Sequence, residues 1–147
     1  MRLTQVFGAV SLAVALLANW EAFAQKRYGP GVTDTEIKIG QTMPYSGPLS
    51  VYGRVGLAQI AYFARLNAEG GINGRKVRLI SLDDGYNPAK AVEQVRRLVE
   101  QDQVLLIFSS FGTATNLAVR KYLNATRVPH LFVTGGDAVW ADWKNYP

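Results

Sequence analysis

The spacing of apolar residues along the chain switches repeatedly between the period of a strand and that of a helix. Residues 35–43 alternate with a period of two, which predicts a strand. The side chains that share one face of this strand are Ile37, Ile39, Gln41 and Met43. Residues 76–82 and 130–134 predict the second and fourth strands, while residues 104–108 form an unbroken apolar run. Such a run is typical of a strand buried on both faces of a parallel sheet.

Segments with helical spacing separate these strands. Residues 52–69 predict a helix that ends at Gly70 and Gly71. The residues expected on its buried side are Val55, Ala58, Tyr62 and Leu66. A second helix begins with Asn87 as N-cap and Pro88 in the first turn, and apolar residues recur along it at helical spacing. A third helix is expected over residues 115–123.

Strands and helices that alternate with short connections specify right-handed βαβ units. The sequence therefore predicts an α/β fold with a doubly wound parallel sheet. In open sheets of this kind, ligands bind at the carboxyl ends of the strands. Three loops follow strands at that edge, namely residues 44–52, 109–115 and 134–137, and all three are small, polar and glycine-containing.

Composition and the N-terminal segment refine this view. With 147 residues, 48% hydrophobic and 18% charged, the chain has room for about one globular domain. The apolar run 6–18 and the motif Ala22-Phe23-Ala24 are typical of a secretory signal peptide, so we expect residues 1–24 to be removed after Ala24. The run is shorter than the roughly 20 residues of a membrane span, although an uncleaved anchor is an alternative. We expect a spacer over residues 25–34, the domain over residues 35–147 and a periplasmic location.

The net charge of +5 raises the possibility of a nucleic-acid partner. The basic residues, however, are scattered over different predicted elements and form no stripe: Lys38, Arg54, Arg65, Lys76, Arg96 and Arg120. We therefore expect a solvated surface and no nucleic-acid partner. Because the chain has no cysteine, an exported form has to be stable without disulfides.

Catalytic motifs are missing from the sequence. No nucleophile elbow, P-loop or dinucleotide-binding fingerprint is present, and the single histidine, His130, has no second histidine or cysteine with which to share a metal. Asp83 and Asp84 are interpreted as turn and capping groups ahead of Pro88. We expect no enzyme, no metal and no cofactor. A secreted α/β enzyme that uses Ser109 or Ser110 is the remaining catalytic alternative.

The loop "SSFGTATN", residues 109–116, suits a small anion such as a carboxylate. Gly112 permits a close approach of the backbone, Thr113 and Thr115 offer hydroxyls, and free amides at the start of the next helix favour negative charge. The alternative is that Thr113 or Thr115 simply caps that helix. Three aromatic residues on these loops either form walls of a pocket or pack against the core, namely Tyr45, Tyr52 and Phe111.

Three long segments resemble a known family. "IKIGQTMPYSGPLSVYG", "NAEGGINGRKVRLISLDDGYNPAKAVEQVRRLVEQDQV" and "KYLNATRVPHLFVTGG" are similar to the N-terminal lobe of the leucine/isoleucine/valine-type periplasmic binding proteins of ABC transporters. The most specific elements are Ser46-Gly47-Pro48 with Tyr52-Gly53, the turn at residues 70–74, and Asp83-Asp84 before Asn87-Pro88. The resemblance covers about residues 35–147.

The resemblance implies a two-lobed protein that closes on a small carboxylate-bearing solute and delivers it to a membrane permease. The ligand-binding residues that it implies are Tyr52, Phe111, Gly112, Thr113, Thr134, Gly135 and Gly136. The family's leucine binders have a serine where this chain has Gly112, and they have a different loop at residues 135–137. A branched-chain amino acid or a related or aromatic acid is therefore the expected solute class.

The length of the chain implies that only one lobe of such a protein is present. We therefore expect an incomplete N-terminal lobe without the second lobe, with apolar surface exposed on Phe132, Val139 and Trp140. Two alternatives come from other classes of function: a ligand-sensing receptor domain of the same fold, and a truncated fragment without function.

Overall fold

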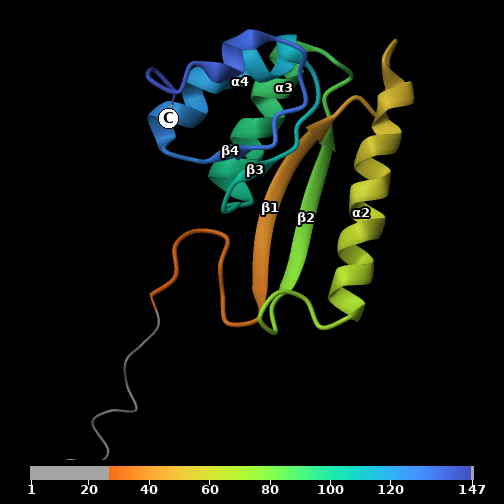
Figure 1. Cartoon of the computed structure of the whole chain (residues 1–147), viewed down its shortest axis with the longest axis vertical. Coiled ribbons are helices and arrows are strands. Elements are labelled where there is room, and N and C mark those ends of the chain that lie inside the picture. Colours follow the sequence, from red (N-terminus) through yellow and green to blue (C-terminus); the bar gives the residue numbers. More distant parts are fainter. Residues whose placement is uncertain (1–26, 147) are drawn as a thin grey trace, which may run out of the picture.

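The computed structural model describes residues 27–146, which form a four-stranded sheet with flanking helices (Figure 1). In chain order the elements are β1 (Glu36–Met43), η2 (Ser50–Tyr52), α2 (Gly53–Ala68), β2 (Lys76–Asp83), α3 (Pro88–Arg96), η3 (Arg97–Gln101), β3 (Ile107–Phe108), α4 (Thr113–Thr126), β4 (His130–Leu131) and η4 (Ala138–Ala141). The predicted signal peptide lies outside the described residues. Within residues 27–146, no helix combines the length and apolar character that crossing a bilayer requires.

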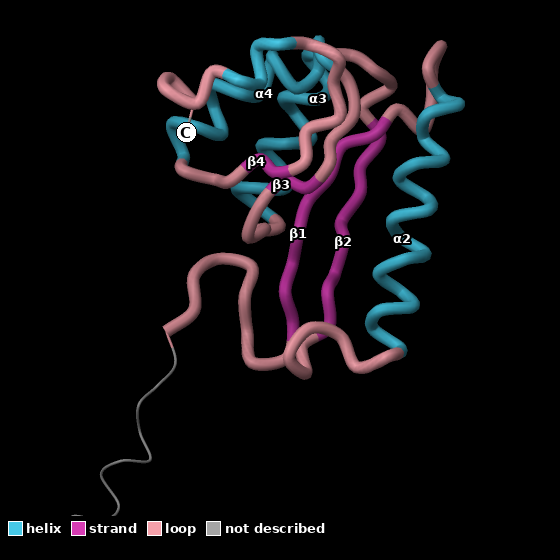
Figure 2. Tube along the Cα trace, in the orientation of Figure 1, coloured by secondary structure: helices cyan, strands magenta, loops and turns pink. Residues whose placement is uncertain are grey.

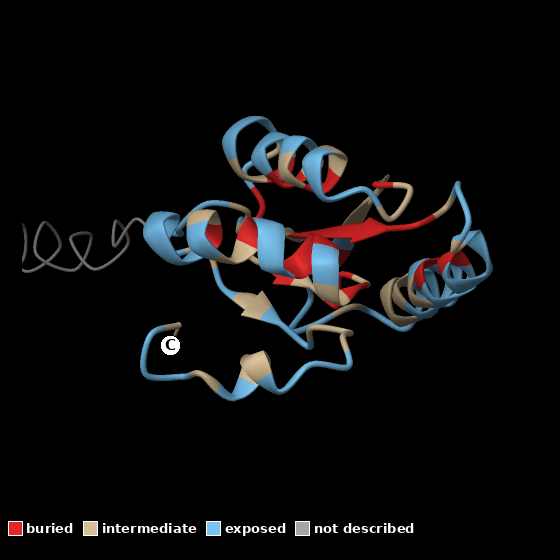
Figure 3. Ribbon diagram, turned by 90° about the horizontal axis from the view of Figure 1, so that it is seen from above, coloured by how far each residue is buried: buried red, intermediate tan, exposed pale blue. Residues whose placement is uncertain are grey.

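The sheet confirms the predicted α/β fold with doubly wound parallel strands. Its strand order is β2-β1-β3-β4, and each neighbouring pair is parallel. α2 covers one face, where the Cα of Gly56 lies close to Met43 of β1. α3 and α4 cover the other face, where Leu98, just beyond α3, contacts the Cα side of Gly40 (Figures 1 and 3). The carboxyl ends of the strands therefore meet at one edge, as the sequence predicts.

The main core lies between the sheet and the α3–α4 pair. Its buried members are Ala91, Val95, Leu98, Val104, Ile107, Val119 and Leu123. Asn87 begins α3 as predicted, because its side-chain oxygen accepts hydrogen bonds from the N–H groups of Ala89 at 2.9 Å and Lys90 at 3.1 Å. This cap and the proline at the first helical position fix where the helix starts after β2.

The buried side of α2 differs from the one predicted. Val55 and Tyr62 are 39% and 63% exposed, and Ala58 is exposed, whereas Gly53 and Gly56 are buried. Because a side chain at position 56 would collide with Tyr45 and Met43, the helix turns its glycines toward β1 and packs closely on the sheet. The prediction followed the helical spacing of apolar residues, but the close packing of two glycines against the sheet decides the orientation. Leu66 is partly buried, in agreement with the prediction.

β3 and β4 are shorter than predicted, which is visible in the two short magenta segments of Figure 2. Ser109 and Phe132 follow these strands with φ angles of 50° and 56°, and a left-handed residue ends the regular pairing. Before β3, the N–H of Leu105 donates to the carbonyl of Lys38 at 2.9 Å. The predicted run 104–108 thus does lie beside β1, but regular strand geometry is restricted to its last two residues.

Candidate functional site

The loops at the carboxyl edge of the sheet enclose a hollow of about 440 Å³. Its lining residues are Leu49, Tyr52, Tyr86, Phe111, Gly112, Thr113, Thr134, Gly135 and Gly136. All seven residues that the family resemblance implied as ligand-binding are in this set, so the structure brings them together around one open space. Leu49 and Tyr86 complete the lining without having been predicted.

Backbone hydrogen bonds continue the sheet pairing past the strands and hold the loops side by side. The N–H of Phe111 donates to the carbonyl of Thr42 at 3.2 Å, and the N–H of Gly112 donates to the carbonyl of Thr134 at 2.8 Å. The N–H of Thr134 in turn donates to the carbonyl of Ser110 at 3.1 Å. These bonds fix the loops after β3 and β4 relative to the end of β1.

The N-terminus of α4 opens at this hollow without a side-chain cap. Gly112 occupies the N-cap position with φ 105°, and no side chain accepts from the first amides of the helix. Thr115, which the sequence offered as a cap, donates its hydroxyl instead to the carbonyl oxygens of Phe111 at 2.7 Å and Gly112 at 3.1 Å. The capping alternative is therefore wrong. The first N–H groups of a helix have no intrahelical acceptor and favour negative charge nearby.

Glycine at position 112 has a packing role that the sequence did not reveal. A Cβ atom built on Gly112 would collide with Cε2 of Tyr86 and lie 2.8 Å from Oγ1 of Thr115. The positive φ of Gly112 is also a conformation that other residues adopt rarely. Tyr86 and Thr115 thus require glycine here, whatever ligand approaches its backbone.

Three aromatic rings from three different loops lie at the hollow. Tyr52 and Phe111 are stacked, with ring centroids 4.7 Å apart and an angle of 22° between planes. The ring planes of Tyr86 and Phe111 are tilted by 56°, and their centroids are 6.3 Å apart. For Tyr45 the alternative of core packing holds, because Tyr45 lies beneath α2 and its hydroxyl is hydrogen-bonded to Ser81 at 2.6 Å.

A chain of polar side chains runs across the sheet below the hollow, on the α2 face. In order, its members are Tyr45, Ser81, Gln41, Gln59, Ser109 and Thr134. Gln41 is fully buried in β1, where Nε2 donates to Oε1 of Gln59 and Oε1 accepts from Ser81 at 2.9 Å. Gln59 of α2 donates to Oγ of Ser109 at 3.0 Å. This row of polar side chains thereby connects α2 to Thr134 of the hollow.

Ser109 and Ser110 are structural residues. Both are buried, and Oγ of Ser110 accepts from the N–H of Thr42 at 3.1 Å, while its carbonyl accepts from Asn116 at 2.8 Å. The only histidine of the chain, His130, lies in β4 and makes no hydrogen bond to either serine. Within residues 27–146, neither serine hydroxyl is hydrogen-bonded to a histidine, lysine or carboxylate side chain that could act as its base.

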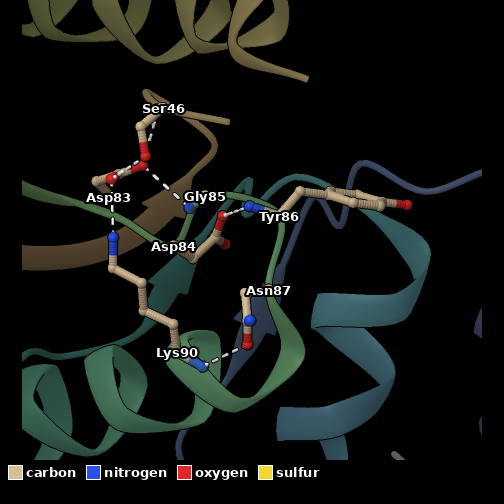
Figure 4. A network of polar contacts seen from close by, with 7 residues as sticks. All are labelled: Ser46, Asp83, Asp84, Gly85, Tyr86, Asn87 and Lys90. Carbon is tan, nitrogen blue, oxygen red and sulfur yellow. Dashed lines mark hydrogen bonds and ion pairs between the residues drawn. The ribbon is translucent and has the colours of Figure 1, made fainter. Parts of the chain in front are cut away.

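Asp83 ties two loops together, as Figure 4 shows. It accepts from the hydroxyl of Ser46 at 2.6 Å, the N–H of Gly85 at 3.0 Å and Nζ of Lys90 at 2.8 Å. Desolvation acts to raise the pKa of Asp83, but the hydrogen bonds from Lys90, Ser46 and Gly85 outweigh it and hold that pKa well below its usual range. The interpretation of Asp83 as a turn residue is confirmed.

Asp84 is fully buried and directs the chain into the next loop residue. Its Oδ1 accepts from the N–H of Tyr86 at 2.8 Å (Figure 4), and its backbone carbonyl accepts from the N–H of Asn87 at 2.9 Å. Burial raises the pKa of Asp84 above its ordinary value, although the hydrogen bond from Tyr86 opposes this. No group of acidic or histidine side chains within residues 27–146 has the arrangement of a metal site.

A hollow at the carboxyl edge of a parallel α/β sheet, with an uncapped helix N-terminus beside it, is the place where proteins of this fold class bind small ligands. Residues 36–147 match the family described as periplasmic binding protein, and the chain belongs to that family. This confirms the family resemblance. Because the family consists of binding proteins, it also agrees with the expectation that the chain is not an enzyme.

Individual relatives show what similar chains bind. The chain is 33% identical over 85 residues to an amino acid binding protein of Pseudomonas aeruginosa, covering 56% of this chain and 22% of that protein. It resembles the branched-chain amino acid transporter substrate binding protein of Streptococcus pneumoniae solved with isoleucine, with TM-score 0.68, 25% identity, and coverage of 76% and 32%. It also resembles a fatty acid ABC transporter substrate-binding protein from Thermomonospora curvata, with TM-score 0.60 and 29% identity. That similarity covers 75% of this chain and 27% of the other protein. The chain thus spans between a fifth and a third of each relative's length.

Proposed function

We propose that residues 35–147 are the N-terminal lobe of an extracytoplasmic solute-binding component of an ABC importer, and that the lobe binds the carboxylate of a small solute. The observation that carries this proposal is the uncapped N-terminus of α4 at the hollow formed by the three loops. The solute class is a branched-chain amino acid or a related or aromatic acid.

Each residue around the hollow has a role in this proposal. The amides that follow Gly112, together with the hydroxyl of Thr113, hold the carboxylate, because they are donors at the positive end of a helix dipole. The loop of Thr134, Gly135 and Gly136 lies against them and forms the opposite wall. Tyr52 and Phe111 cover the apolar part of the solute.

The ligands named for the relatives support the choice of a carboxylate. Amino acids, isoleucine and fatty acids differ in size and in their amino group, but all three carry a carboxylate. A carboxylate site on the lobe shared with these proteins is the simplest chemistry that serves all of them. The same relatives support a membrane permease as partner. A periplasmic location follows if residues 1–24 act as the signal peptide.

The test uses backbone variants of Thr113 in the chain of residues 25–147. Thr113→Pro removes the N–H at the first position of α4, and Gly112 before it has ψ 137°, which suits the residue preceding a proline. Thr113→Val keeps the N–H and removes only the hydroxyl. Titration of the ¹⁵N-labelled chain with isovalerate and with isopentylamine separates carboxylate binding from binding of the apolar tail.

We expect isovalerate, but not isopentylamine, to shift the amide signals at the start of α4. Affinity should fall in Thr113→Pro by roughly tenfold, the usual cost of one charge-assisted hydrogen bond, and less in Thr113→Val. The proposal is wrong if isovalerate leaves these amides unchanged at millimolar concentration, or if the amine produces the same shifts.

A further inference from the structure

We propose that Tyr86 is a specificity-determining residue of the hollow and that it selects solutes with a planar aromatic ring next to the carboxylate. This inference rests on the proposed function. It assigns a ligand-binding role to the loop after β2, which is not among the three loops that the sequence analysis assigned to the ligand.

Tyr86 is presented to the hollow by an unusual backbone. Gly85 and Tyr86 have consecutive φ angles of 57° and 60°, and a left-handed conformation is costly for tyrosine. The buried carboxylate of Asp84 holds it there through the N–H of Tyr86 at 2.8 Å. The side chain points away from the Asp83–Asp84 network in Figure 4. The turn therefore places the ring at the hollow, where it packs over Gly112 and against Phe111.

Gly112 makes the space that the ring occupies. The edge of the Tyr86 ring lies so close to Gly112 that an added Cβ would collide with it, directly before the uncapped start of α4. A carboxylate bound to the first amides of α4 therefore has its neighbouring carbon atoms beside this ring. An aromatic ring attached at that point can meet Tyr86 edge to face or offset, the arrangements that aromatic pairs prefer.

The surroundings of Tyr86 leave its ring available to a bound planar ligand. The Tyr86 ring is only partly buried, and its hydroxyl makes no hydrogen bond within the described part of the chain. With the stacked pair Tyr52 and Phe111, it surrounds the hollow with aromatic surface from the loops after β1, β2 and β3. A ring that served only the fold would be expected to bury its faces and pair its hydroxyl.

The test compares two carboxylates of similar size, benzoate and cyclohexanecarboxylate, which differ in planarity and aromatic character. The ¹⁵N-labelled chain of residues 25–147 is titrated with each, and the amide shifts at the start of α4 give two dissociation constants. Their ratio isolates ring recognition from carboxylate binding. We expect benzoate to bind roughly three- to tenfold more tightly, which is the size of one or two aromatic contacts.

Variants of Tyr86 show whether this residue sets the ratio. Tyr86→Leu should bring the ratio to about one, and Tyr86→Phe should preserve it. Tyr62→Leu changes an exposed tyrosine on α2 outside the hollow and should leave the ratio unchanged. Contacts between benzoate protons and the Tyr86 ring, observed as nuclear Overhauser effects in the unmodified chain, test the placement even if a variant fails to fold.

The outcomes separate the two proposals. If both carboxylates shift the α4 amides with equal affinity, or if the benzoate preference survives in Tyr86→Leu, the role of Tyr86 is wrong and the carboxylate site stands. If neither carboxylate shifts those amides, the proposed function fails, and the inference about Tyr86 fails with it.

Discussion

At the scale of single residues, Gly112 is the position where backbone conformation and side-chain packing coincide. We expect Gly112→Ala to lower the free energy of unfolding by about 2–4 kcal/mol, since it combines a positive φ with a collision against Tyr86 and Thr115. Gly70→Ala is a matched control, because Gly70 has φ 108° but nothing within 4 Å of the added atom. Urea denaturation of both variants measures the difference, which is the cost of the collision alone.

If the two substitutions reduced stability equally, the space at position 112 would not matter, and the packing of Tyr86 over Gly112 would be contradicted. Gly112→Ala should then reduce the free energy of unfolding as much in a Tyr86→Ala background as in the original chain. The packing predicts the opposite, namely partial rescue.

His130 makes stability depend on pH. Burial lowers its pKa from 6.5 to about 4, so the unfolded chain binds a proton at a higher pH than the folded chain does. The stabilisation by neutral His130 is therefore complete above pH 6.5 and is lost as the pH falls toward 4. We expect the free energy of unfolding to fall by about 2 kcal/mol from this group between pH 7 and 4.5.

The measurement compares urea denaturation at both pH values for the original chain and for His130→Leu. Carboxyl groups such as Asp83 and Asp84 also titrate in acid, so the informative quantity is the difference between the two chains. An equal loss of stability in both would show that His130 is not kept neutral by burial.

Sequence reasoning found most of the residues around the hollow because they directly follow parallel strands, where the fold itself locates ligands. Tyr86 was missed. It also follows a strand, but Asp83, Asp84 and Gly85 before it have the composition of an ordinary turn. The signal that could have found it was an aromatic residue at the carboxyl end of β2. Its direction depends on a buried carboxylate and on space at Gly112, which lies far away in the sequence.

At the scale of elements, the polar chain between the sheet and α2 sets how the helix is docked. Gln59 connects the buried Gln41 of β1 to Ser109 at the end of β3. Gln59→Leu should reduce the free energy of unfolding by about 2 kcal/mol, because it leaves buried polar groups on both neighbours with fewer partners. Arg54→Leu, an exposed substitution on the same helix, should change it by less than about 0.5 kcal/mol.

A double variant sharpens this test. In Gln41→Leu with Gln59→Leu, both partners of the central hydrogen bond become apolar, so the loss should be smaller than the sum of the two single losses. Strict additivity would mean that the two glutamines contribute independently and that the polar chain is not one network.

The elements also show where periodicity is sufficient and where it is not. The start of α3 could be predicted because Asn87 and Pro88 act locally. The buried side of α2 could not, since it depends on the glycines that fit against Tyr45 and Met43 and on the partner of Gln59. The ends of β3 and β4 depend on left-handed residues, Ser109 and Phe132, that have no local sequence signal.

At the scale of the whole molecule, the alternation of strands and helices was enough to predict the parallel doubly wound sheet. The distribution of exposed apolar surface was predicted only in part. The expected exposed residues were Phe132, Val139 and Trp140. Phe132 is 74% exposed, whereas Val139 and Trp140 are partly buried and line a small cavity beside α4. The short helix η4 folds back onto α4, which sequence periodicity does not reveal.

Phe132 ends a row of three aromatic rings along the α2 side of the sheet. The ring centroids of Phe63 in α2 and Phe108 in β3 are 5.5 Å apart, and those of Phe108 and Phe132 are 5.7 Å apart. Both pairs meet edge to face. α2 lies over β2 and β1, so the β4 end of this row is left open (Figure 1). An exposed apolar surface of this kind promotes association and the binding of apolar dyes.

We expect the chain of residues 25–147 to bind 8-anilinonaphthalene-1-sulfonate and to associate at micromolar concentration. Phe132→Asn should reduce both, because it removes the most exposed ring. It should leave the free energy of unfolding unchanged or slightly higher, since asparagine tolerates the left-handed φ of 56° better than phenylalanine does.

Phe63→Asn is the contrasting variant, because Phe63 is partly buried and its replacement should destabilise the fold. Dye fluorescence, sedimentation velocity and urea denaturation of the three chains measure these effects. Unchanged dye binding in Phe132→Asn would show that the exposed apolar surface lies elsewhere and that the open end of the aromatic row does not govern association.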